Sequence, residues 1–382
     1  MRVLHILNEL KPSGAELMYL AAVELWQAHG LECEILATGA QPGTLASRMA
    51  DAGFKIHHLP FRRSPRFPAK VCGFLRSGKY DAVHIDTERA WYALAAYAAG
   101  VPCVVRTIHN NFPFRGLLRL RRAAQRWLMR RLRVRMIAVS PSVQSTEAGH
   151  FHNPAEVVWN WFDDRRFRLP SEEERTGARD ALGIASQAFV ILSVGGCSPV
   201  KNHGAIIDAV AACAPEIPLF YLHAGEGPES RSERKRAILR HVENRVRFLG
   251  QLPHEQLVLV LRAADAFLMP SLHEGLSCAA VEAMASGLPA IFSAVPGLRD
   301  FQAMIPGIRW IEPTAGSLAS AVRELHAMPR EQRWQLGAKL SAAAHREFGR
   351  TRGAMQYLTL YGCGVSHQLL VPNVRTQVTR IS

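Results

Sequence analysis

The chain has 382 residues and a formal net charge of +14; 48% of its residues are apolar and 20% are charged. That composition excludes an intrinsically disordered chain, and the length exceeds one ordinary hydrophobic core, so two domains are expected. The seven cysteines are scattered without a C-x-x-C pair, which argues for a reduced cytosolic protein without a disulfide framework or structural zinc.

Membrane insertion and secretion find no support in the sequence. No stretch approaches the ~18 to 20 consecutive apolar residues of a membrane-spanning helix. The segment Met1–Leu7 lacks the long apolar core and the cleavage site of a signal peptide. We therefore expect a cytoplasmic protein whose first residues form a strand.

Short apolar runs alternate with helical patterns along the chain, which predicts an α/β fold with parallel sheets. The strands predicted in the first half are Val3–Leu7, Glu34–Ala37, Ala82–Ile85, Cys103–Thr107, Met136–Val139 and Glu156–Trp159. Those predicted in the second half are Phe189–Val194, Leu219–Ala224, Val246–Leu249, Ala266–Met269, Ala290–Ser293 and Ile308–Ile311. Between the two series, the polar segment 163–183 shows no strand pattern and is the expected connection. A last helix is expected at 350–361, followed by a tail without a clear pattern.

Arginines dominate one predicted helix of the first half. From Arg89 to Thr146 there is no acidic residue, and six arginines recur there at spacings of three and four, namely Arg115, Arg119, Arg122, Arg126, Arg130 and Arg133. Helical periodicity places them on one face, with Leu117, Leu120, Ala124, Trp127 and Leu128 largely on the other. The arginine face either keeps the protein soluble or binds an anionic surface such as inner-leaflet lipid. Nucleic acid is a further possibility, although no nucleic-acid-binding motif accompanies the patch.

Two common nucleotide-binding signatures are absent from the sequence. No G-x-G-x-x-G follows the first predicted strand, which leaves little support for a dinucleotide oxidoreductase. No G-x-x-x-x-G-K-[ST] occurs either, which excludes P-loop kinases.

The most informative stretch is 270–289, which places two carboxylates, Glu274 and Glu282, around a predicted helix N-terminus. Ser277 is a plausible N-cap, the helix is expected over Cys278–Ala285, and Gly287 suits the C′ position. Free N–H groups at a helix N-terminus attract phosphate, and neighbouring carboxylates can accept hydrogen bonds from hydroxyls. One loop and helix could therefore hold a diphosphate and two sets of sugar hydroxyls.

This stretch resembles the retaining nucleotide-sugar glycosyltransferases of family 4, whose mark is two glutamates separated by seven residues. The surrounding Pro-Ser, Glu-Gly-Leu and Glu-Ala-Met-Ala-Ser-Gly-Leu-Pro also fit. The resemblance extends over about residues 1–362 and is most specific over 194–300. It implies an α/β fold of GT-B architecture, in which two Rossmann-like doubly wound domains face each other across a cleft. It also implies an N-terminal acceptor domain at 1–165, a donor domain at 166–349, and a C-terminal segment, 350–382, that packs back on the first domain.

The resemblance assigns roles to individual residues. Glu274 would hold sugar hydroxyls and Glu282 the ribose hydroxyls, while Lys201 and the backbone of Gly275, Leu276 and Ser277 hold the diphosphate. Gly14, in Ser13-Gly14-Ala15-Glu16, would close over the diphosphate. His109, in a Thr-x-His motif, would line the cleft beside the leaving phosphate. The nucleobase would meet the backbone near Phe248, Leu249 and Gly250.

The sequence departs from the family pattern at several of these sites. Ser13 and Trp161 each occupy a position where the family usually has Gly. Gly196 occupies the position of an Arg that, in the family, neutralises the diphosphate together with the lysine. Without the resemblance, His109 would be interpreted as a structural histidine and Lys201 as a surface lysine. The missing arginine leaves open a non-catalytic nucleotide-sugar-binding protein.

The resemblance implies a retaining hexosyltransferase that uses a nucleotide-diphosphate sugar, with a UDP-sugar favoured and GDP-mannose as the other donor. The acceptor would be a saccharide or lipid-linked saccharide of cell-surface polysaccharide synthesis. No cofactor and no metal are expected, since no Asp-x-Asp motif occurs. The arginine helix adds peripheral contact with the inner face of an anionic membrane, and no nucleic-acid partner is expected. A nucleotide-sugar isomerase of the 2-epimerase type on the same fold is the remaining alternative.

Overall fold

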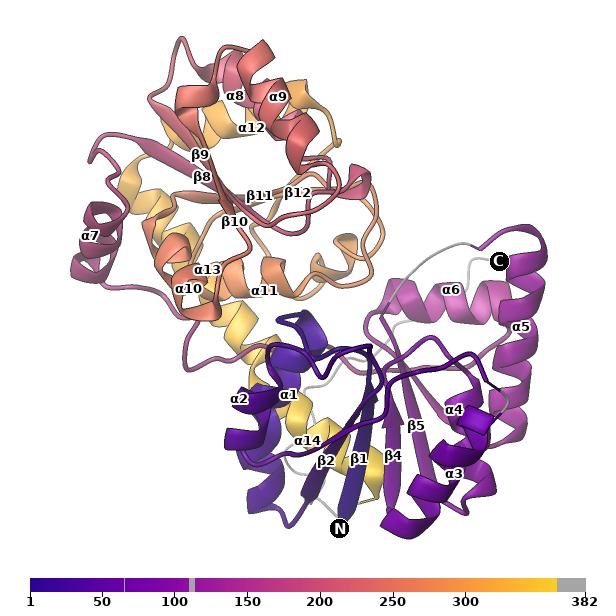
Figure 1. Ribbon diagram of the computed structural model, residues 1–382. Coiled ribbons are helices and arrows are strands. Elements are labelled where there is room, and N and C mark those ends of the chain that lie inside the picture. Colours follow the sequence, from indigo (N-terminus) through magenta and orange to yellow (C-terminus); the bar gives the residue numbers. More distant parts are fainter. Residues whose placement is uncertain (65, 110–113, 363–382) are drawn as a thin grey trace, which may run out of the picture.

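The computed structural model describes residues 1–64, 66–109 and 114–362 and contains two parallel sheets, one above the other in Figure 1. The first sheet has the order β3-β2-β1-β4-β5-β6-β7. Its strands are β1 (Arg2–Leu7), β2 (Glu32–Ala37), β3 (Lys55–His58), β4 (Ala82–Ile85), β5 (Cys103–Ile108), β6 (Arg135–Ala138) and β7 (Glu156–Val157). The second has the order β10-β9-β8-β11-β12-β13. Its strands are β8 (Phe189–Val194), β9 (Leu219–Ala224), β10 (Val246–Gly250), β11 (Ala266–Met269), β12 (Ala290–Ser293) and β13 (Arg309–Ile311).

Helices connect the strands of each sheet, as the parallel pairing requires. Those associated with the first sheet are α1 (Gly14–Ala28), α2 (Ala46–Asp51), α3 (Arg66–Gly78), α4 (Trp91–Ala98), α5 (Gly116–Arg131) and α6 (Pro141–Phe151). Those of the second half are α7 (Glu172–Ala181), α8 (His203–Cys213), α9 (Ser230–Leu239), α10 (His254–Ala263), α11 (Cys278–Ala285), α12 (Ala315–Ala327), α13 (Arg330–Phe348) and α14 (Arg350–Tyr361). Short 3-10 turns lie at Pro199–Lys201, Glu243–Arg245 and Arg299–Phe301. No helix in the described parts of the chain is both long and apolar enough to cross a membrane.

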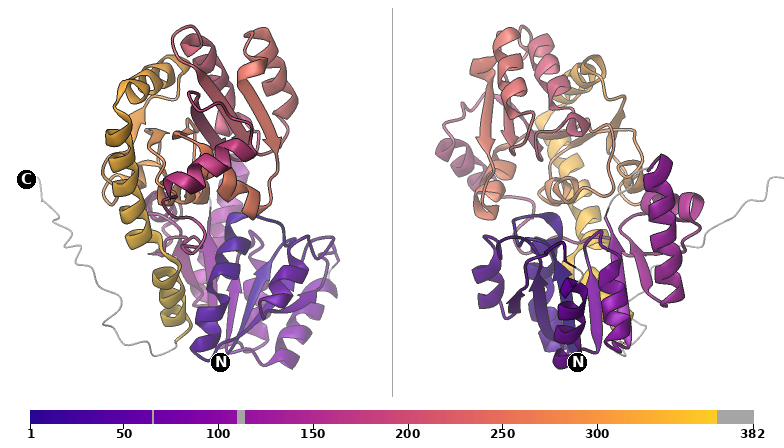
Figure 2. Two further views of the ribbon diagram at one scale, coloured as in Figure 1. Left: turned by 90° about the vertical axis from the view of Figure 1, so that its left-hand side faces the viewer. Right: turned by 45° about the vertical axis from the view of Figure 1, so that its right-hand side comes forward.

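The last two helices run from the second domain back to the first, as Figure 2 shows in yellow. Helix α13 packs on the second core, and α14 follows directly and packs beside α1, where the Trp26 indole donates to the carbonyl of Ala354 at 3.1 Å. Residues 363–382 lie outside the described part. The division at 165/166 and 349/350 stays our proposal for the domain boundaries.

The predicted GT-B type of fold, with two doubly wound parallel sheets, is confirmed. Every predicted strand is present within two residues at either end, and five of the twelve have the predicted bounds. The strand β3 is additional. Its sequence, Lys-Ile-His-His, lacks an apolar run because it lies at an edge of the sheet, where pairing and not burial decides the conformation.

The orientation predicted for the arginine helix is partly wrong. Helix α5 lies at the right-hand edge of Figure 1, and two arginines of the predicted solvent face point into the domain. Arg126 is 1% exposed and binds Glu147 with contacts of 2.7 to 3.1 Å, and Arg122 binds Glu88 at 2.7 Å. Glu88 and Glu147 lie just outside the segment that lacks acidic residues, one on each side of it in the sequence. The fold brings both of them into contact with the arginines of that segment.

The apolar side of the same helix faces solvent. Leu117 is 84% exposed, Leu120 67% and Trp127 51%. Since the ion pairs with Glu88 and Glu147 balance the charges of Arg122 and Arg126, the helix can bury part of its polar face without an unpaired charge. The hydrophobic face is therefore the one left on the surface.

A buried histidine in the first sheet predicts an acid-sensitive stability. Burial lowers the pKa of His5 to about 3, and neither ring nitrogen has a hydrogen-bond partner among the described residues. The unfolded chain therefore binds a proton below about pH 6.5 that the native protein does not bind, so stability falls as the pH falls toward 3. At pH 5, about 1.5 pH units below the ordinary histidine pKa, the free energy of unfolding is lower by about 2 kcal/mol, because each unit costs about 1.36 kcal/mol.

We expect His5→Phe to remove this part of the acid sensitivity, because Phe keeps the ring contacts with Tyr19 and Trp26 without a group to protonate. Urea unfolding at pH 7 and pH 5 measures the effect. The loss between the two pH values should be smaller in the variant by about 2 kcal/mol. An equal loss in both proteins would contradict the assignment.

Candidate functional site

The glutamate pair is positioned by a short helix at the edge of the second domain that faces the first (Figure 1). Helix α11 spans Cys278–Ala285, the bounds predicted from the sequence. The Ser277 hydroxyl caps it by accepting from the N–H of Ala280 at 3.3 Å. Gly287 follows the helix with φ +78°, a conformation that favours glycine. The local sequence therefore determines where this helix begins and ends.

Lys201 and Glu274 meet directly. The Lys201 ammonium lies 2.7 Å from Oε1 of Glu274, and both side chains are largely buried. Lys201 ends the 3-10 turn after β8, whereas Glu274 lies in the loop between β11 and α11. Two residues that are 73 positions apart thus form one charged pair at the carboxyl ends of adjacent strands, where ligands bind in this class of sheet.

The first domain contacts the loop that carries Glu274. The Ser140 hydroxyl donates to the carbonyl of Gly275 at 3.0 Å. Next to it, the Ser142 hydroxyl donates to Asp300 at 2.7 Å and accepts from the N–H of Gly297 at 3.1 Å. Both serines lie at the start of α6. These contacts fix the position of the first domain relative to the predicted diphosphate loop.

A cavity of about 430 Å³ lies between the domains beside this pair. Such a volume suits a small-molecule ligand. Its lining includes Gly14, Gly195, Gly196, Gln251, Leu252, His254, Cys278 and Glu282. Gly14 approaches the partner domain so closely that an added Cβ would lie 2.8 Å from Sγ of Cys278. Glu282, from α11, has Oε1 3.6 Å from Nε2 of His254.

His109 lies at the end of β5 and is held by Asp86, which follows β4. Nε2 of His109 lies 3.1 Å from Oδ1 of Asp86, and the Tyr19 hydroxyl donates to Oδ2 at 2.6 Å. Burial opposes ionisation of Asp86, but the charges and hydrogen bonds of its neighbours His84, His109 and Tyr19 outweigh it and lower its pKa to about 2. Asp86 is therefore a carboxylate at neutral pH, and it fixes the orientation of the His109 ring.

Sequence reasoning missed Asp86. Its signal was its position directly after a buried strand, at the sheet edge where ligand-binding residues gather. The neighbouring residue Asn110, part of the motif around His109, lies outside the described residues.

The structure brings Gly14 and Glu282 to the cavity, with Lys201, Glu274 and Ser277 grouped around the N-terminus of α11. Phe248 and Leu249 are not among the described residues that line it. Phe248 packs on His223 with ring centroids 6.1 Å apart, and Leu249 packs against the second core. The cavity instead reaches Gln251 and Leu252, which lie two and three positions after Leu249. The assignment of Phe248 and Leu249 to the nucleobase stays a prediction.

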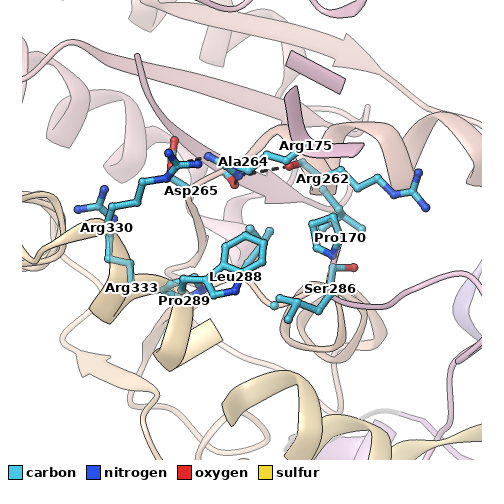
Figure 3. Close-up of a pocket in the computed structure, with 14 residues that line it drawn as sticks. Pro170, Arg175, Arg262, Ala264, Asp265, Ser286, Leu288, Pro289, Arg330 and Arg333 are labelled. Atoms are coloured by element: carbon cyan, nitrogen blue, oxygen red, sulfur yellow. Dashed lines mark hydrogen bonds and ion pairs between the residues drawn. The ribbon is translucent and has the colours of Figure 1, made fainter. Parts of the chain in front are cut away.

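A second concavity lies at the opposite end of α11 (Figure 3). Arginines surround it, but they already have partners: Arg175 donates to Asp265 at 2.6 Å, and Arg333 donates to the carbonyl of His326 at 3.0 Å. Asp265 directly precedes β11, so this concavity lies at the amino ends of the strands. Ligands of doubly wound sheets bind at the other end, which favours the cavity between the domains.

Two family descriptions match the chain in tandem. Glycosyltransferase Family 4 matches residues 12–166, and Glycosyl transferases group 1 matches residues 174–340. The two matches meet in the connection between the sheets, and the second contains both Lys201 and the glutamate pair.

Individual relatives agree with these matches. The protein EpsF of Bacillus subtilis (strain 168), named as a glycosyltransferase, is 28% identical over 313 residues, which cover 76% of this chain and 79% of its own. The UDP-Gal:alpha-D-GlcNAc-diphosphoundecaprenol alpha-1,3-galactosyltransferase of Escherichia coli is 28% identical over 235 residues, 58% of this chain and 60% of its own. The crystal structure of Anabaena HepE in complex with UDP and glucose has a TM-score of 0.79 at 19% identity, and the match covers 94% of this chain and 98% of that one. The chain belongs to the group 1 glycosyltransferases of the GT-B fold.

Proposed function

We propose that this glycosyltransferase moves a hexosyl group from a nucleotide-diphosphate sugar, with retention of configuration, to a saccharide or lipid-linked acceptor of cell-surface polysaccharide synthesis. The observation that carries the proposal is the Lys201–Glu274 pair at the N-terminus of α11, next to a cavity between the domains. A cation, free N–H groups and a carboxylate thereby surround one point. This set of groups matches a sugar diphosphate, in which phosphate and hydroxyls are adjacent.

Each group then has a defined role. Lys201 and the N–H groups at Gly275–Ser277 neutralise the diphosphate, and its negative charge grows as the sugar leaves. Glu274 accepts hydrogen bonds from sugar hydroxyls, and Glu282 accepts from the ribose. Gly14 lets the first domain close over the diphosphate without a side chain in the way. The missing arginine at Gly196 leaves Lys201 as the main cation at this point.

The reaction breaks the bond between the anomeric carbon and the phosphate oxygen and forms a bond to the acceptor oxygen on the same face. The acceptor proton passes to the leaving phosphate, so no protein nucleophile and no metal at the diphosphate are required. We assign His109, which Asp86 orients at 3.1 Å, the role of donating a hydrogen bond from the first domain where negative charge develops.

A UDP-sugar is favoured as donor, with GDP-mannose as the alternative. Support comes from HepE, whose structure holds UDP and glucose, and from the E. coli relative, whose name specifies UDP-Gal. The acceptor named for that relative is a diphosphoundecaprenol-linked sugar, which supports a lipid-linked acceptor here.

Replacement of Glu282 tests the donor site. Glu282→Ala would leave ribose hydroxyls without an acceptor in a largely buried place, at a cost of about 1 to 3 kcal/mol in nucleotide binding. Calorimetric titration with UDP, GDP and ADP measures this, and the expected Kd rises by about 5- to 150-fold for the preferred nucleotide. Glu324→Ala, at a solvent-exposed position of α12, is the matched control.

Unchanged nucleotide affinity in the Glu282→Ala variant would contradict the assignment. The unaltered protein should release free sugar slowly from the preferred donor when no acceptor is present. Nucleotide binding without sugar release would identify a non-catalytic binding protein, and conversion of the sugar to an isomer would identify an epimerase.

We also propose that α5 attaches the protein to an anionic membrane through its apolar stripe of Leu117, Leu120 and Trp127. Leu and Trp beside arginines are typical of helices that lie in the membrane interface. The helix also exposes Arg119, Arg121, Arg130 and Arg131, and the Arg131 guanidinium lies over the Trp127 ring at 5.1 Å from its centre. The proposed membrane contact therefore uses the hydrophobic face, where the sequence alone suggested the arginine face, and the exposed arginines add attraction to anionic lipid.

Replacing the three apolar residues together by Gln should lower binding to phosphatidylglycerol vesicles by at least about tenfold, since each buried apolar side chain contributes about 1.5 to 3 kcal/mol. Co-sedimentation measures the bound fraction. Ile238→Gln with Leu239→Gln, two exposed apolar residues of α9, is the control and should bind like the original protein. Equal binding of the triple variant would refute the proposed surface.

A further inference from the structure

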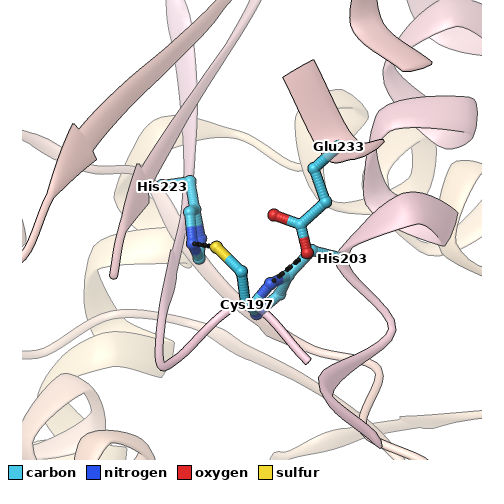
Figure 4. A group of neighbouring side chains, drawn as sticks. All are labelled: Cys197, His203, His223 and Glu233. Carbon is cyan, nitrogen blue, oxygen red and sulfur yellow. Dashed lines mark hydrogen bonds and ion pairs between the residues drawn. The ribbon is translucent and has the colours of Figure 1, made fainter. Parts of the chain in front are cut away.

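Four side chains with metal-binding atoms meet in the second domain, beside the loop that carries Lys201 (Figure 4). Cys197 lies in the loop after β8, His203 begins α8, His223 lies on β9 and Glu233 lies on α9. All four are buried, and their ligand atoms lie within 4.8 Å of one another. The group thus joins four elements that are otherwise separate in sequence.

The distances within the group approach those of a coordination shell. Sγ of Cys197 lies 3.2 Å from Nε2 of His223, and Nδ1 of His203 lies 3.1 Å from Oε1 of Glu233. Around a tetrahedral zinc ion with Zn–N of 2.0–2.1 Å and Zn–S of 2.3 Å, ligand atoms lie about 3.3 to 3.6 Å apart. Small side-chain adjustments would bring all four atoms to these values.

Protein hydrogen bonds alone leave this group incomplete. Oε2 of Glu233 is buried and has no hydrogen-bond partner among the described residues. A buried carboxylate oxygen without a partner is costly. The other contact inside the group, between the Cys197 sulfur and the His223 ring, is only a weak hydrogen bond, because sulfur is a poor donor and acceptor. A cation between the four side chains would satisfy every one of them.

A second layer of contacts orients one of the ligands. Nδ1 of His223 forms a hydrogen bond with the hydroxyl of Ser193 at 2.8 Å, and that hydroxyl meets Tyr221 Oη at 2.7 Å. Nε2 of the same ring is therefore directed to the cluster. Histidines that bind metals are oriented by such a hydrogen bond on the other nitrogen.

We propose that Cys197, His203, His223 and Glu233 bind one zinc ion with a structural role. A thiolate, a carboxylate and two neutral imidazoles balance the charge of Zn²⁺, which suits a buried place. Binding releases the thiol proton of Cys197 to solvent. Four protein ligands fill a tetrahedral shell and leave no position for substrate, so the ion acts on structure and takes no part in the transfer.

A zinc ion at this place would also hold the loop after β8 that carries Lys201. Gly196 and Lys201 lie on either side of the ligand Cys197, and His203 follows them, so the ion would fasten this segment to β9 and α9. The expectation of no structural zinc rested on the absence of C-x-x-C pairs. That pattern cannot detect a site with one cysteine and ligands from four elements.

The proposal is tested by the metal content of the full chain. The protein is expressed without a polyhistidine tag and passed through gel filtration before the measurement. Elemental mass spectrometry should find about one zinc per chain, and Cys197→Ser and His223→Gln should each reduce it to below about 0.1. The matched control is Cys213→Ser, since Cys213 is a buried cysteine of α8 outside the cluster, and it should keep its zinc. Zinc retained in both cluster variants would overturn the assignment.

Three further measurements on the unaltered protein remain informative where a cluster variant does not fold. A strong chelator should lower Tm and speed hydrogen exchange at Gly196–Lys201, and added ZnCl₂ should reverse both. Cobalt in place of zinc should give the absorption of a tetrahedral thiolate complex. Absence of zinc after incubation with ZnCl₂, with Tm unchanged by the chelator, would show that the cluster is only a hydrogen-bonded network.

Discussion

Replacing Lys201 by Ala should reduce kcat of sugar transfer by about 10²- to 10³-fold, the usual effect of removing one group that stabilises charge in the transition state. The effect should be at the upper end because Gly196 stands where a second cation is usual, so no neighbouring arginine at that position can compensate. KM for the donor should rise less than kcat falls, since the charge on the diphosphate is greatest as the bond breaks.

This prediction is tested by following the release of the nucleotide diphosphate in the presence of the preferred donor and an acceptor. Lys235→Ala, an exposed lysine of α9 in the same domain, should keep the original rate. Because Lys201 also neutralises Glu274, the Tm of the variant must be measured as well. A folded Lys201→Ala variant with unchanged kcat would place the diphosphate elsewhere.

Replacing Glu147 by Ala should lower the free energy of unfolding by about 3 to 5 kcal/mol, the usual cost of breaking a buried ion pair. Three contacts of 2.7 to 3.1 Å join it to Arg126, which is almost fully buried. The amide of Asn153 also donates to Glu147 at 2.7 Å. Without the carboxylate, the guanidinium keeps its charge in a place closed to water.

Urea unfolding gives the free energy, and Glu24→Ala is the control. Glu24 pairs with Arg165 on the surface, where an ion pair contributes about 0 to 1 kcal/mol. The double variant Arg126→Met with Glu147→Met should recover most of the loss, since no charge is then left unpaired. A small effect of Glu147→Ala would mean that α5 can swing out and expose Arg126, which would also undo the proposed orientation of its apolar stripe.

The inner strands of both sheets could be predicted because they are short, apolar and bounded by turn residues, which is the pattern of a strand buried on both faces. The edge strand β3 could not, since three of its four side chains are polar. Helix α11 could be predicted with its ends because Ser277 and Gly287 act on the backbone beside them. Caps are local interactions, and they do not depend on the rest of the fold.

The sequence by itself determined the order of elements, the helix that carries the glutamate pair, and the periodicity of α5. Only the tertiary structure decided which face of α5 points outward, because Glu88 and Glu147 reach its arginines from other elements. It likewise decided that Asp86 orients His109 and that Cys197 meets two histidines and a glutamate. Periodicity and capping act over a few residues, whereas these charged and polar contacts join residues brought together by the packing of sheets and helices.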